Sequence, residues 1–448
     1  MTVLIDTRQE LSKPSDLGPL YQDYAYGYPH KSAYRTFDNP PRLADLWQEE
    51  NKDHLFLYLH LPFCEMRCGF CNLFTAANPI EDIVAAYLKA LTTQMRIVRE
   101  EIGHFRPVQM ALGGGTPTLL STAALADLLD SVALYCEADP ASISAAIETS
   151  PQTVTHQRMA LLAERGFERI SIGVQSFDEA ETRVMGRTQK VTLVEQALDT
   201  IRNYDFARLN IDLIYGAQNQ TPQSFVTSLR RALAWQPEEI FLYPLYIRTL
   251  TGLDGRRQVV DEHRRQLYRA GRDFLLSAGY YQVSMRAFHR MAVADRPTQN
   301  EFSCQEDGVV GLGTGARSYT GGAHYSSRYA VSRGKVLDII KDFTVCSEET
   351  FRYAEHGFMM DKNEAMRRFM LKSIMRSDGL DRQRFFSLFD ISPEVAFPVL
   401  TQLEAIGLLC FDERVIRPTA SGLEHGDAVP PLFYSRKVRQ LMDEDILL

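Results

Sequence analysis

Three closely spaced cysteines are the residues in this sequence best suited to chemistry. Cys64, Cys68 and Cys71 lie in the segment YLHLPFCEMRCGFC, over residues 58–71. Thiolates at this spacing can bind three irons of a [4Fe-4S] cluster and leave the fourth iron without a protein ligand. An amino acid such as methionine can occupy that iron through its amine and carboxylate, which brings a sulfonium close enough to accept an electron. The spacing therefore predicts a redox cluster with an open coordination position.

Zinc is the competing metal for these thiols. A structural zinc site takes four ligands, usually as two pairs, and no second cysteine pair follows at a suitable distance. His60 is a possible fourth ligand in principle, but it lies on the strand that precedes the loop. Three unrelated buried cysteines are the remaining alternative. The other four of the seven cysteines are scattered, and this odd total fits metal binding in a reducing compartment better than disulfides.

A repeating strand and helix pattern places the cysteine loop at the end of a strand. Six β-rich runs cover residues 54–62, 108–115, 142–150, 168–176, 207–216 and 239–247. Segments with helical spacing, such as 81–102 and 192–204, lie between them. Nearly continuous apolar strands indicate a buried parallel sheet, which we expect to curl into a partial (β/α)6 TIM-like barrel of the α/β class. An open doubly wound sheet is the alternative.

Polar motifs follow the second and third of these strands, where the chemistry of such barrels is found. Gly114, Gly115 and Thr116 form a loop in which a ligand can approach the backbone without meeting a Cβ. By itself this motif is also typical of a tight turn. Glu148 ends the third strand and can accept hydrogen bonds from hydroxyl or ammonium groups. A surface salt bridge or a helix N-terminus is the structural alternative for Glu148.

Further candidate site residues lie on or after the later strands and on the first strand. Asp212 lies within an apolar strand, where a carboxylate is unfavourable unless it is bonded. Arg187 is its candidate partner, in a structural pair or as a group that holds a ligand carboxylate. Gln175 ends the fourth strand. Tyr58 and His60 alternate with apolar residues, so both are expected to face inward, although a buried core tyrosine is the alternative for Tyr58.

The CxxxCxxC loop, with the aromatic Phe70 before its last cysteine, resembles the signature of the radical S-adenosylmethionine superfamily. The lead-in YLHLPFC is similar, more narrowly, to the oxygen-independent coproporphyrinogen III oxidase-like branch. The likeness covers residues from about 50 to 325 and continues more weakly to the C-terminus. It implies a [4Fe-4S] cluster on the three cysteines, one or two molecules of S-adenosyl-L-methionine, and an electron donor such as flavodoxin or ferredoxin.

The resemblance also implies which residues line the site. Cosubstrate contacts are expected from Tyr58, Phe70, Gly114, Gly115, Thr116, Glu148, Gln175, Arg187, Asp212 and Tyr246. Tyr246 replaces a small residue of the porphyrinogen oxidase, and Arg317 stands where the branch usually has a small or apolar one. Arg317 therefore either faces solvent or meets an acidic or carbonyl-bearing substrate.

One departure bears on the reaction. The porphyrinogen oxidase has another cysteine two residues after its third cluster ligand, whereas this sequence has Leu73. The main hypothesis is therefore hydrogen abstraction by a 5′-deoxyadenosyl radical from an unidentified small-molecule substrate, large and aromatic or tetrapyrrole-like, with methyl or methylene transfer from a second S-adenosylmethionine. Coproporphyrinogen III oxidative decarboxylation and haem binding or delivery are the alternatives.

The chain divides by pattern into four parts. We expect an N-terminal arm over 1–50, a barrel over 51–290, connecting substrate-side loops over 291–360, and a winged-helix-like α+β domain over 361–448. The arm holds the tyrosine-rich stretch YQDYAYGYPHKSAYR at 21–35, which suits either a large aromatic ligand or a strap packed on the barrel. In the last part, helices are expected at 363–376, 381–389 and 393–406, ahead of a short segment at 408–426.

Bulk composition excludes some classes of function. The 448 residues carry a formal net charge of −8, which gives no basic face for nucleic acid. Acids and bases are about balanced in the C-terminal part, which favours a packing domain over a DNA-binding one. No apolar run of eighteen residues and no signal segment is present, so a cytoplasmic protein without membrane partners is expected.

Overall fold

The computed structural model describes residues 10–21, 27–256, 259–291 and 302–445. Its centre is a curved sheet in which the six expected strands lie side by side and parallel. They are β2 (Leu55–Leu61), β5 (Pro107–Gly114), β6 (Ser144–Thr149), β7 (Arg169–Gln175), β8 (Arg208–Tyr215) and β9 (Glu239–Pro244). The partial (β/α)6 TIM-like barrel is thereby confirmed, and its cysteine loop follows β2.

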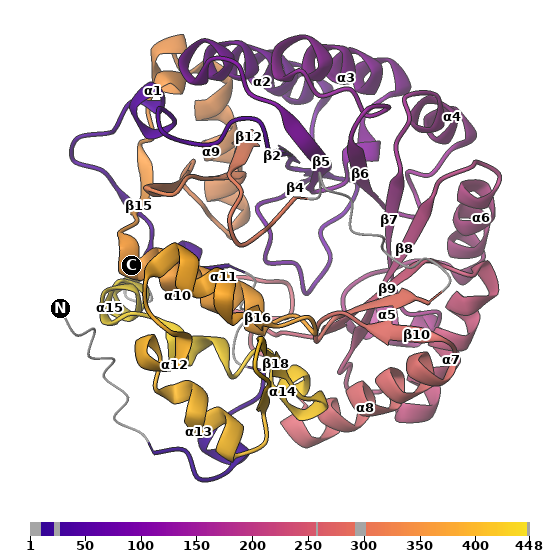
Figure 1. The fold of residues 1–448 in the computed structure, drawn as a ribbon. Helices are drawn as coiled ribbons and strands as arrows, with labels where there is room; N and C mark the ends of the chain where they lie inside the picture. Colours follow the sequence, from indigo (N-terminus) through magenta and orange to yellow (C-terminus); the bar gives the residue numbers. More distant parts are fainter. Residues whose placement is uncertain (1–9, 22–26, 257–258, 292–301, 446–448) are drawn as a thin grey trace.

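Helices cover the outer face of this sheet (Figure 1). They are α2 (Glu81–Ile102), α3 (Thr122–Cys136), α4 (His156–Glu164), α6 (Val191–Arg202), α7 (Pro222–Ala232) and α8 (Asp261–Ser277). The short helix α5 (Glu179–Val184) follows β7, and α1 (Leu43–Leu46) precedes β2.

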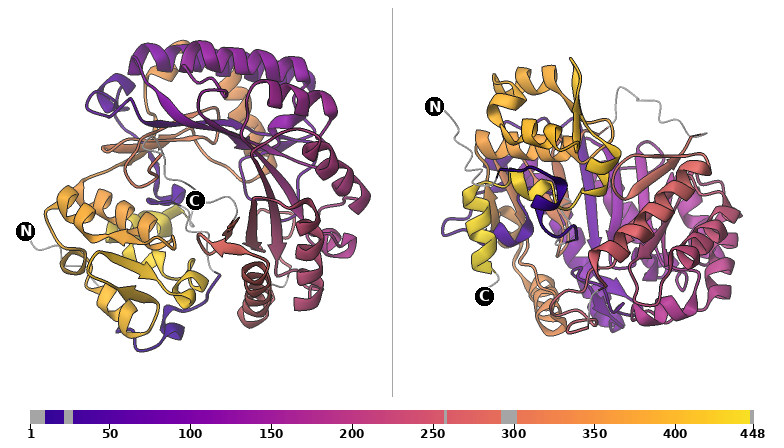
Figure 2. Two further views of the ribbon diagram at one scale, coloured as in Figure 1. Left: turned by 45° about the vertical axis from the view of Figure 1, so that its right-hand side comes forward. Right: turned by 90° about the horizontal axis from the view of Figure 1, so that it is seen from below.

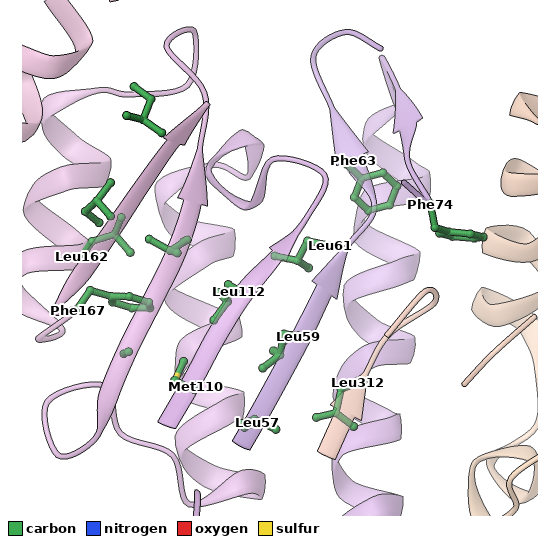
Figure 3. Packing of buried hydrophobic residues seen from close by; sticks show 14 of the residues in the cluster. Leu57, Leu59, Leu61, Phe63, Phe74, Met110, Leu112, Leu162, Phe167 and Leu312 are labelled. Atoms are coloured by element: carbon green, nitrogen blue, oxygen red, sulfur yellow. The ribbon is translucent and has the colours of Figure 1, made fainter. Parts of the chain in front are cut away.

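Strand β2 shows why the two faces of the sheet differ. Leu57, Leu59 and Leu61 are buried in the main hydrophobic core, beside Met110 and Leu112 of β5 (Figure 3). Successive side chains of a strand point to opposite faces, so the residues between the leucines project to the concave side. Burial of the leucines fixes this register, because a slip by one residue would exchange the two faces.

The sheet extends beyond the six βα units at both edges. After β9 come β11 (Ala287–Arg290) and β10 (Tyr280–Gln282), and before β2 lies β12 (Val309–Leu312), which is parallel to it. Antiparallel strands then continue in the order β13 (Arg317–Tyr319), β14 (Ala323–Ser326), β15 (His356–Met359) and β1 (Arg35–Thr36).

This extension corrects the expectation that residues 291–360 form connecting loops. Four strands of the main sheet and helix α9 (Arg333–Val345) lie between residues 309 and 359. Strands of three or four residues interrupted by glycines are too short to show a clear alternation of apolar and polar residues, which is why the sequence pattern missed them.

The C-terminal part has the expected winged-helix order. It contains α10 (Lys362–Ile374), β16 (Leu380–Asp381), α11 (Arg382–Phe389), α12 (Pro393–Ala396), α13 (Val399–Ala405), β17 (Leu409–Phe411) and β18 (Val415–Pro418), and then α14 (Ala420–Glu424) and α15 (Arg436–Asp445). Its three strands form a separate antiparallel sheet around a second core. This unit lies across from α3 and α4 in Figure 1 and packs beside the central sheet in both views of Figure 2.

The tyrosines of the arm pack as a strap in the part that the structure describes. Tyr21 lies edge-on to Tyr215, with ring centroids 6.1 Å apart, and Tyr28 and Tyr34 are buried in a small core that includes residues of α15. Tyr24 and Tyr26 lie outside the described residues. No helix in the described ranges is long and apolar enough to cross a membrane.

Candidate functional site

One cavity of about 760 Å³ collects every residue predicted for the site. It is lined by Tyr58, Cys64, Cys68, Phe70, Cys71, Gly114, Gly115, Thr116, Glu148, Gln175, Arg187, Asp212 and Tyr246. These residues lie up to about 190 positions apart in the sequence, and the parallel strands bring them together at one edge of the sheet. Their roles stay predictions, but their convergence on one cavity is a property of the fold.

Each thiol of the cysteine loop has a hydrogen-bonding group beside it. The Thr116 hydroxyl bonds the sulfur of Cys64, and Arg187 Nη1 donates to Cys68 Sγ at 3.4 Å. Thr75 Oγ1 lies 3.8 Å from Cys71 Sγ. Donors aimed at sulfur favour the thiolate, which is the form that binds metal.

Burial has the opposite effect on the thiols when no cation is near. It raises the pKa of Cys64 to about 12 and also raises the pKa of Cys71, so that positive charge is needed to hold these groups as thiolates. Among the described residues, no three His, Cys, Asp or Glu side chains converge closely enough for a single metal ion. A cluster does not require such convergence, because each cysteine binds a different iron. The three residues therefore fit a cluster.

His60 is not placed as a fourth ligand. Its Nδ1 lies 3.2 Å from the Tyr58 hydroxyl and its Nε2 lies 2.9 Å from the Phe74 carbonyl oxygen. Burial lowers the pKa of His60 to about 4, so the ring is neutral and its two nitrogens join the first strand to the end of the cysteine loop. Tyr58 thus faces the cavity with its hydroxyl near a buried histidine.

The glycine loop packs closely against its neighbours and uses its amides internally. A Cβ on Gly114, whose φ is 104°, would lie 2.4 Å from the His60 ring, and one on Gly115 would lie 2.4 Å from the Phe63 carbonyl oxygen. The Gly115 amide donates to Leu61 and the Thr116 amide to Phe63. Close packing against His60 and Phe63 therefore requires glycine at these two positions, and the amides of Gly115 and Thr116 already have partners within the protein. An ammonium group needs acceptors, so an amino group remains a suitable ligand for this loop.

Two carboxylates face the cavity from the concave side of the sheet, surrounded by protein atoms although their side chains are open to the cavity itself. Glu148 Oε2 accepts a hydrogen bond from the Gly114 amide at 3.1 Å. Asp212 Oδ1 accepts from Asn210 Nδ2 at 2.7 Å. Burial, reinforced by the charge of Asp212, raises the pKa of Glu148 to about 7, and burial raises the pKa of Asp212 to about 6. Both groups are thus poised to bind hydroxyl or cationic groups of a ligand.

Among the described residues, Arg187 and Asp212 do not form a salt bridge, which was one of the two alternatives for Arg187. Its Nε donates to Gln189 at 2.8 Å and its Nη2 to the Gly173 carbonyl at 2.8 Å, while Nη1 faces Cys68. Gln189 in turn donates to the Val174 carbonyl at 2.6 Å. The guanidinium is therefore held in place by the end of β7, which aims it at the cysteine loop.

Gln175 has an unusual backbone. Its φ is 69°, and the pairing of β7 with β8 shifts by one residue between Gly173 and Gln175. A positive φ is unfavourable for a side chain with a Cβ and is concentrated at functional sites. The bulge turns the Gln175 side chain into the cavity, where the sequence predicted it.

The C-terminal unit reaches the cavity wall through Tyr246. The Tyr246 hydroxyl donates to Asp427, and Arg286 Nη2 lies 2.9 Å from the hydroxyl and 2.7 and 2.6 Å from the two Asp427 oxygens. The Arg248 guanidinium lies over the Tyr246 ring, 4.8 Å from its centroid. Sequence reasoning missed Arg286 and Asp427, because neither belongs to a local motif.

Other residues of the wall were also missed. Cys304, Arg368 and Lys372 line the cavity together with Arg317. Cys304, one of the four cysteines that are scattered along the sequence, thus also faces the cavity. Arg368 and Lys372 are four residues apart on one helix, and this spacing on a helix with many buried residues was the available signal.

The raised pKa of Glu148 predicts a pH dependence of folding. Between its ordinary value near 4.5 and about 7 the folded state binds more protons than the unfolded state, so stability falls as pH rises through this window. In urea unfolding of the metal-free chain, we expect the wild type to lose more stability between pH 5.5 and 7.5 than Glu148→Gln. Equal losses in the two proteins would show that Glu148 ionises normally in the fold.

The comparisons with known proteins agree with this geometry. A model of the Radical SAM superfamily matches residues 58–232, and one of the HemN C-terminal domain matches residues 360–425. The oxygen-independent coproporphyrinogen III oxidase of Paracoccus denitrificans is 29% identical over 67% of this chain and 76% of its own. That of Helicobacter pylori is 24% identical over 94% of both chains.

Two further matches are a relative with a different name and a solved structure. Heme chaperone HemW of Bacillus subtilis is 25% identical over 83% of this chain and 97% of its own. The solved structure of coproporphyrinogen III oxidase (HemN) from Escherichia coli, a radical SAM enzyme, covers 95% of this chain and 99% of its own, with a TM-score of 0.78 and 23% identity. At that identity the structural match supports the fold.

Proposed function

The chain belongs to the radical S-adenosylmethionine superfamily, in its oxygen-independent coproporphyrinogen III oxidase-like branch, and on this premise we propose that it directs a 5′-deoxyadenosyl radical at a large aromatic, tetrapyrrole-like substrate. One observation carries the proposal. The cavity that holds the cysteine loop is also walled by aromatic rings, among them Tyr58, Tyr243, Tyr319 and Tyr329. Such walls suit a flat ligand.

The residues of this chain have distinct parts in the proposal. Cys64, Cys68 and Cys71 would hold the [4Fe-4S] cluster. When bound, the cluster and S-adenosylmethionine supply the electron and the carbon radical that abstracts a hydrogen atom. The glycine loop, Glu148, Gln175, Arg187 and Asp212 would hold the cosubstrate, with carboxylates for its hydroxyl and ammonium groups and Arg187 for its carboxylate.

Segments outside the barrel form part of the cavity wall and would limit the access of water to a radical. His30 and Lys31 of the arm line the cavity, as do residues of helix α10, so two segments outside the barrel help to enclose the barrel edge. The Lys31 ammonium lies 3.5 Å from the centroid of the Tyr329 ring, and the Tyr329 hydroxyl donates to the Asn72 carbonyl at 2.6 Å. The arm is thereby tied to the cysteine loop, beside the place where the radical would form.

We further propose one-carbon transfer from a second S-adenosylmethionine as the outcome. Leu73 lines the cavity with 49% of its surface exposed, and it provides no thiol at the position where the porphyrinogen oxidase has a cysteine. Coproporphyrinogen III decarboxylation is the second candidate, because relatives named for that activity match over 94% of both chains.

The test is anaerobic turnover of the reconstituted, dithionite-reduced protein with S-adenosylmethionine and either coproporphyrinogen III or haem. Mass spectrometry would follow 5′-deoxyadenosine, S-adenosylhomocysteine and the tetrapyrrole. Substrate-dependent formation of both nucleosides with a mass gain in the tetrapyrrole supports one-carbon transfer. Loss of carbon dioxide from coproporphyrinogen without S-adenosylhomocysteine supports the second candidate. Absence of 5′-deoxyadenosine from fully cluster-loaded protein contradicts both, and stoichiometric haem binding in that case would favour the haem-delivery alternative.

A further inference from the structure

One patch of the surface lies directly over the cysteine loop. Gly69, between Cys68 and Cys71, is buried, and it is covered by a turn at residues 248–254 in which Gly252 is exposed. A Cβ on Gly252 would lie 3.0 Å from Gly69 Cα, so an exposed residue touches the neighbour of a cluster cysteine. We propose that this patch is the docking surface for an acidic protein that carries one electron to the cluster. The inference rests on the proposed function, since it names the partner that this chemistry needs.

Two surface segments are bonded to the cysteine loop at this point. The Gly69 amide donates to the Gly186 carbonyl, just after α5, at 3.1 Å, and the Leu253 amide donates to the Gly69 carbonyl at 3.0 Å. A Cβ on Gly69 would lie 2.7 Å from the Met185 carbonyl oxygen, so glycine is what lets the segments close on the loop. Leu253 and Met185 share an apolar cluster against which Phe70 packs. Electron transfer weakens steeply with distance, and it is therefore favoured where the cover is thin and well bonded.

Two exposed arginines flank this contact. Arg183 lies in the last turn of α5, and Arg256 follows the turn that covers Gly69. Arg256 Nη1 donates to the Val184 carbonyl at 3.1 Å, which holds its guanidinium beside the end of α5. The whole chain has a formal net charge of −8, so this positive surface is a local exception. Opposite charge on a partner would attract it to this patch and orient it there.

The carboxylates of these segments have partners within the protein. Glu179 of α5 pairs with Lys190 at 3.3 Å, and Glu181 of the same helix is buried. Asp254 accepts a hydrogen bond from the Leu250 amide at 2.8 Å. Within the part of the chain that the structure describes, neither exposed arginine forms an ion pair with a carboxylate. The two guanidinium groups are thus available to the carboxylates of an acidic partner.

An apolar side chain completes the patch. Leu250 lies in the turn that covers Gly69 and is 58% exposed. Its φ is 65°, a conformation that is unfavourable for a residue with a Cβ and that the hydrogen bond to Asp254 helps to hold. Protein interfaces commonly combine apolar contacts at the centre with charged groups at the rim. Leu250 between Arg183 and Arg256 has this composition.

The step at this surface transfers a single electron. A carrier with a flavin mononucleotide starts as the anionic hydroquinone and ends as the neutral semiquinone, which is the loss of one electron without loss of a proton. That electron reduces the bound cluster by one unit. The part of this chain is to hold the carrier where the cover over the cysteine loop is thin.

The experiment separates docking from chemistry by changing the reductant. The probe is flavodoxin, a small acidic flavoprotein, used with the cluster-loaded full-length protein. Binding is measured anaerobically from the fluorescence anisotropy of labelled flavodoxin. Formation of 5′-deoxyadenosine is then measured with flavodoxin hydroquinone or with dithionite as the electron source. Dithionite is small and needs no docking surface, so its rate reports the chemistry alone.

We expect the double variant Arg183→Glu with Arg256→Glu to weaken flavodoxin binding and the flavodoxin-driven rate by about 10-fold or more at low ionic strength. The loss should shrink as salt is added, because exposed charges are screened. Leu250→Ser should weaken binding with little dependence on salt, since it removes an apolar contact. Lys362→Glu is the matched charge reversal, at an exposed lysine that begins α10 of the C-terminal unit, and should bind as the wild type does. All variants should keep the dithionite-driven rate of the wild type.

Two results would overturn the docking surface. One is wild-type binding that does not weaken as salt is added, and the other is undiminished binding by the double arginine variant when circular dichroism shows that it is folded. The radical proposal is judged separately. If fully cluster-loaded protein forms no 5′-deoxyadenosine with dithionite, the radical proposal fails, whereas salt-sensitive binding that the double variant loses still supports the surface.

Discussion

Replacing Cys68 by alanine is expected to remove both the iron–sulfur cluster and the cleavage of S-adenosylmethionine. Cys68 is the middle residue of the cysteine loop, and its sulfur is the one that Arg187 Nη1 approaches at 3.4 Å. Loss of a ligand leaves one iron held by sulfide alone, and even the loss of groups behind a metal ligand lowers affinity or activity by about 10- to 100-fold. We therefore expect 5′-deoxyadenosine formation to fall by on the order of 100-fold or more.

The measurement is iron and sulfide content after anaerobic reconstitution, with visible absorbance and nucleoside analysis on the same sample. Cys410→Ala is the matched control, because Cys410 is exposed on strand β17 of the C-terminal unit. It should retain full iron. A Cys68→Ala protein that kept its iron and its deoxyadenosine product would refute the assignment of this loop.

Replacing Asp427 by alanine is expected to destabilise the fold by about 3–5 kcal/mol, because it removes one partner of a buried ion pair. Arg286 is 4% exposed and Asp427 is 1% exposed, and the Arg286 Nη2 atom contacts both carboxylate oxygens. The variant also removes the acceptor of the Tyr246 hydroxyl. The C-terminal unit would thus lose a contact with the barrel and the cavity wall would lose its support.

Urea unfolding measures this loss. Asp378→Ala is the matched control, since its pair with Arg376 lies in the same unit with 62% of the Asp378 side chain exposed. Such an exposed pair contributes about 0–1 kcal/mol. The double variant Arg286→Met with Asp427→Leu should be more stable than Asp427→Ala, because it removes both charges together. An Asp427→Ala protein with the unfolding midpoint of the wild type would contradict this account.

The sequence predicted the elements whose signals are long and local. All six parallel strands lie within a few residues of the predicted runs, and helix α2 spans the predicted 81–102, because long apolar periodicities dominate there. The winged-helix order followed for the same reason, although the helix expected over 393–406 is divided before Pro398. The residues predicted for the site converge because they lie on the parallel strands of the barrel or in the loops that follow them, and the barrel fixes the positions of both.

Contacts between distant segments were beyond the reach of sequence patterns. Strands β13–β15 are three or four residues long and take their register from one another. Arg286 and Asp427 are 141 residues apart, and neither lies in a sequence motif from which its partner could be predicted. Arg368 and Lys372 lie within the helix expected at 363–376, and only the docking of that helix brings them to the cavity. The missed part of the site is thus the part that depends on how the units pack.

Strand β12 carries a consequence for the synthesis of the chain. It pairs directly with β2 in the sheet, on the side opposite β5, yet the two strands are separated by about 250 residues of sequence. At ribosomal rates of about 5–20 residues per second, roughly 12–50 s pass between the emergence of β2 and that of β12. During that interval the nascent barrel presents a bare strand edge on the element that carries the cysteine loop. The edge closes only when β12 pairs with β2, so the sheet beside the cysteine loop is completed late in the synthesis of the barrel.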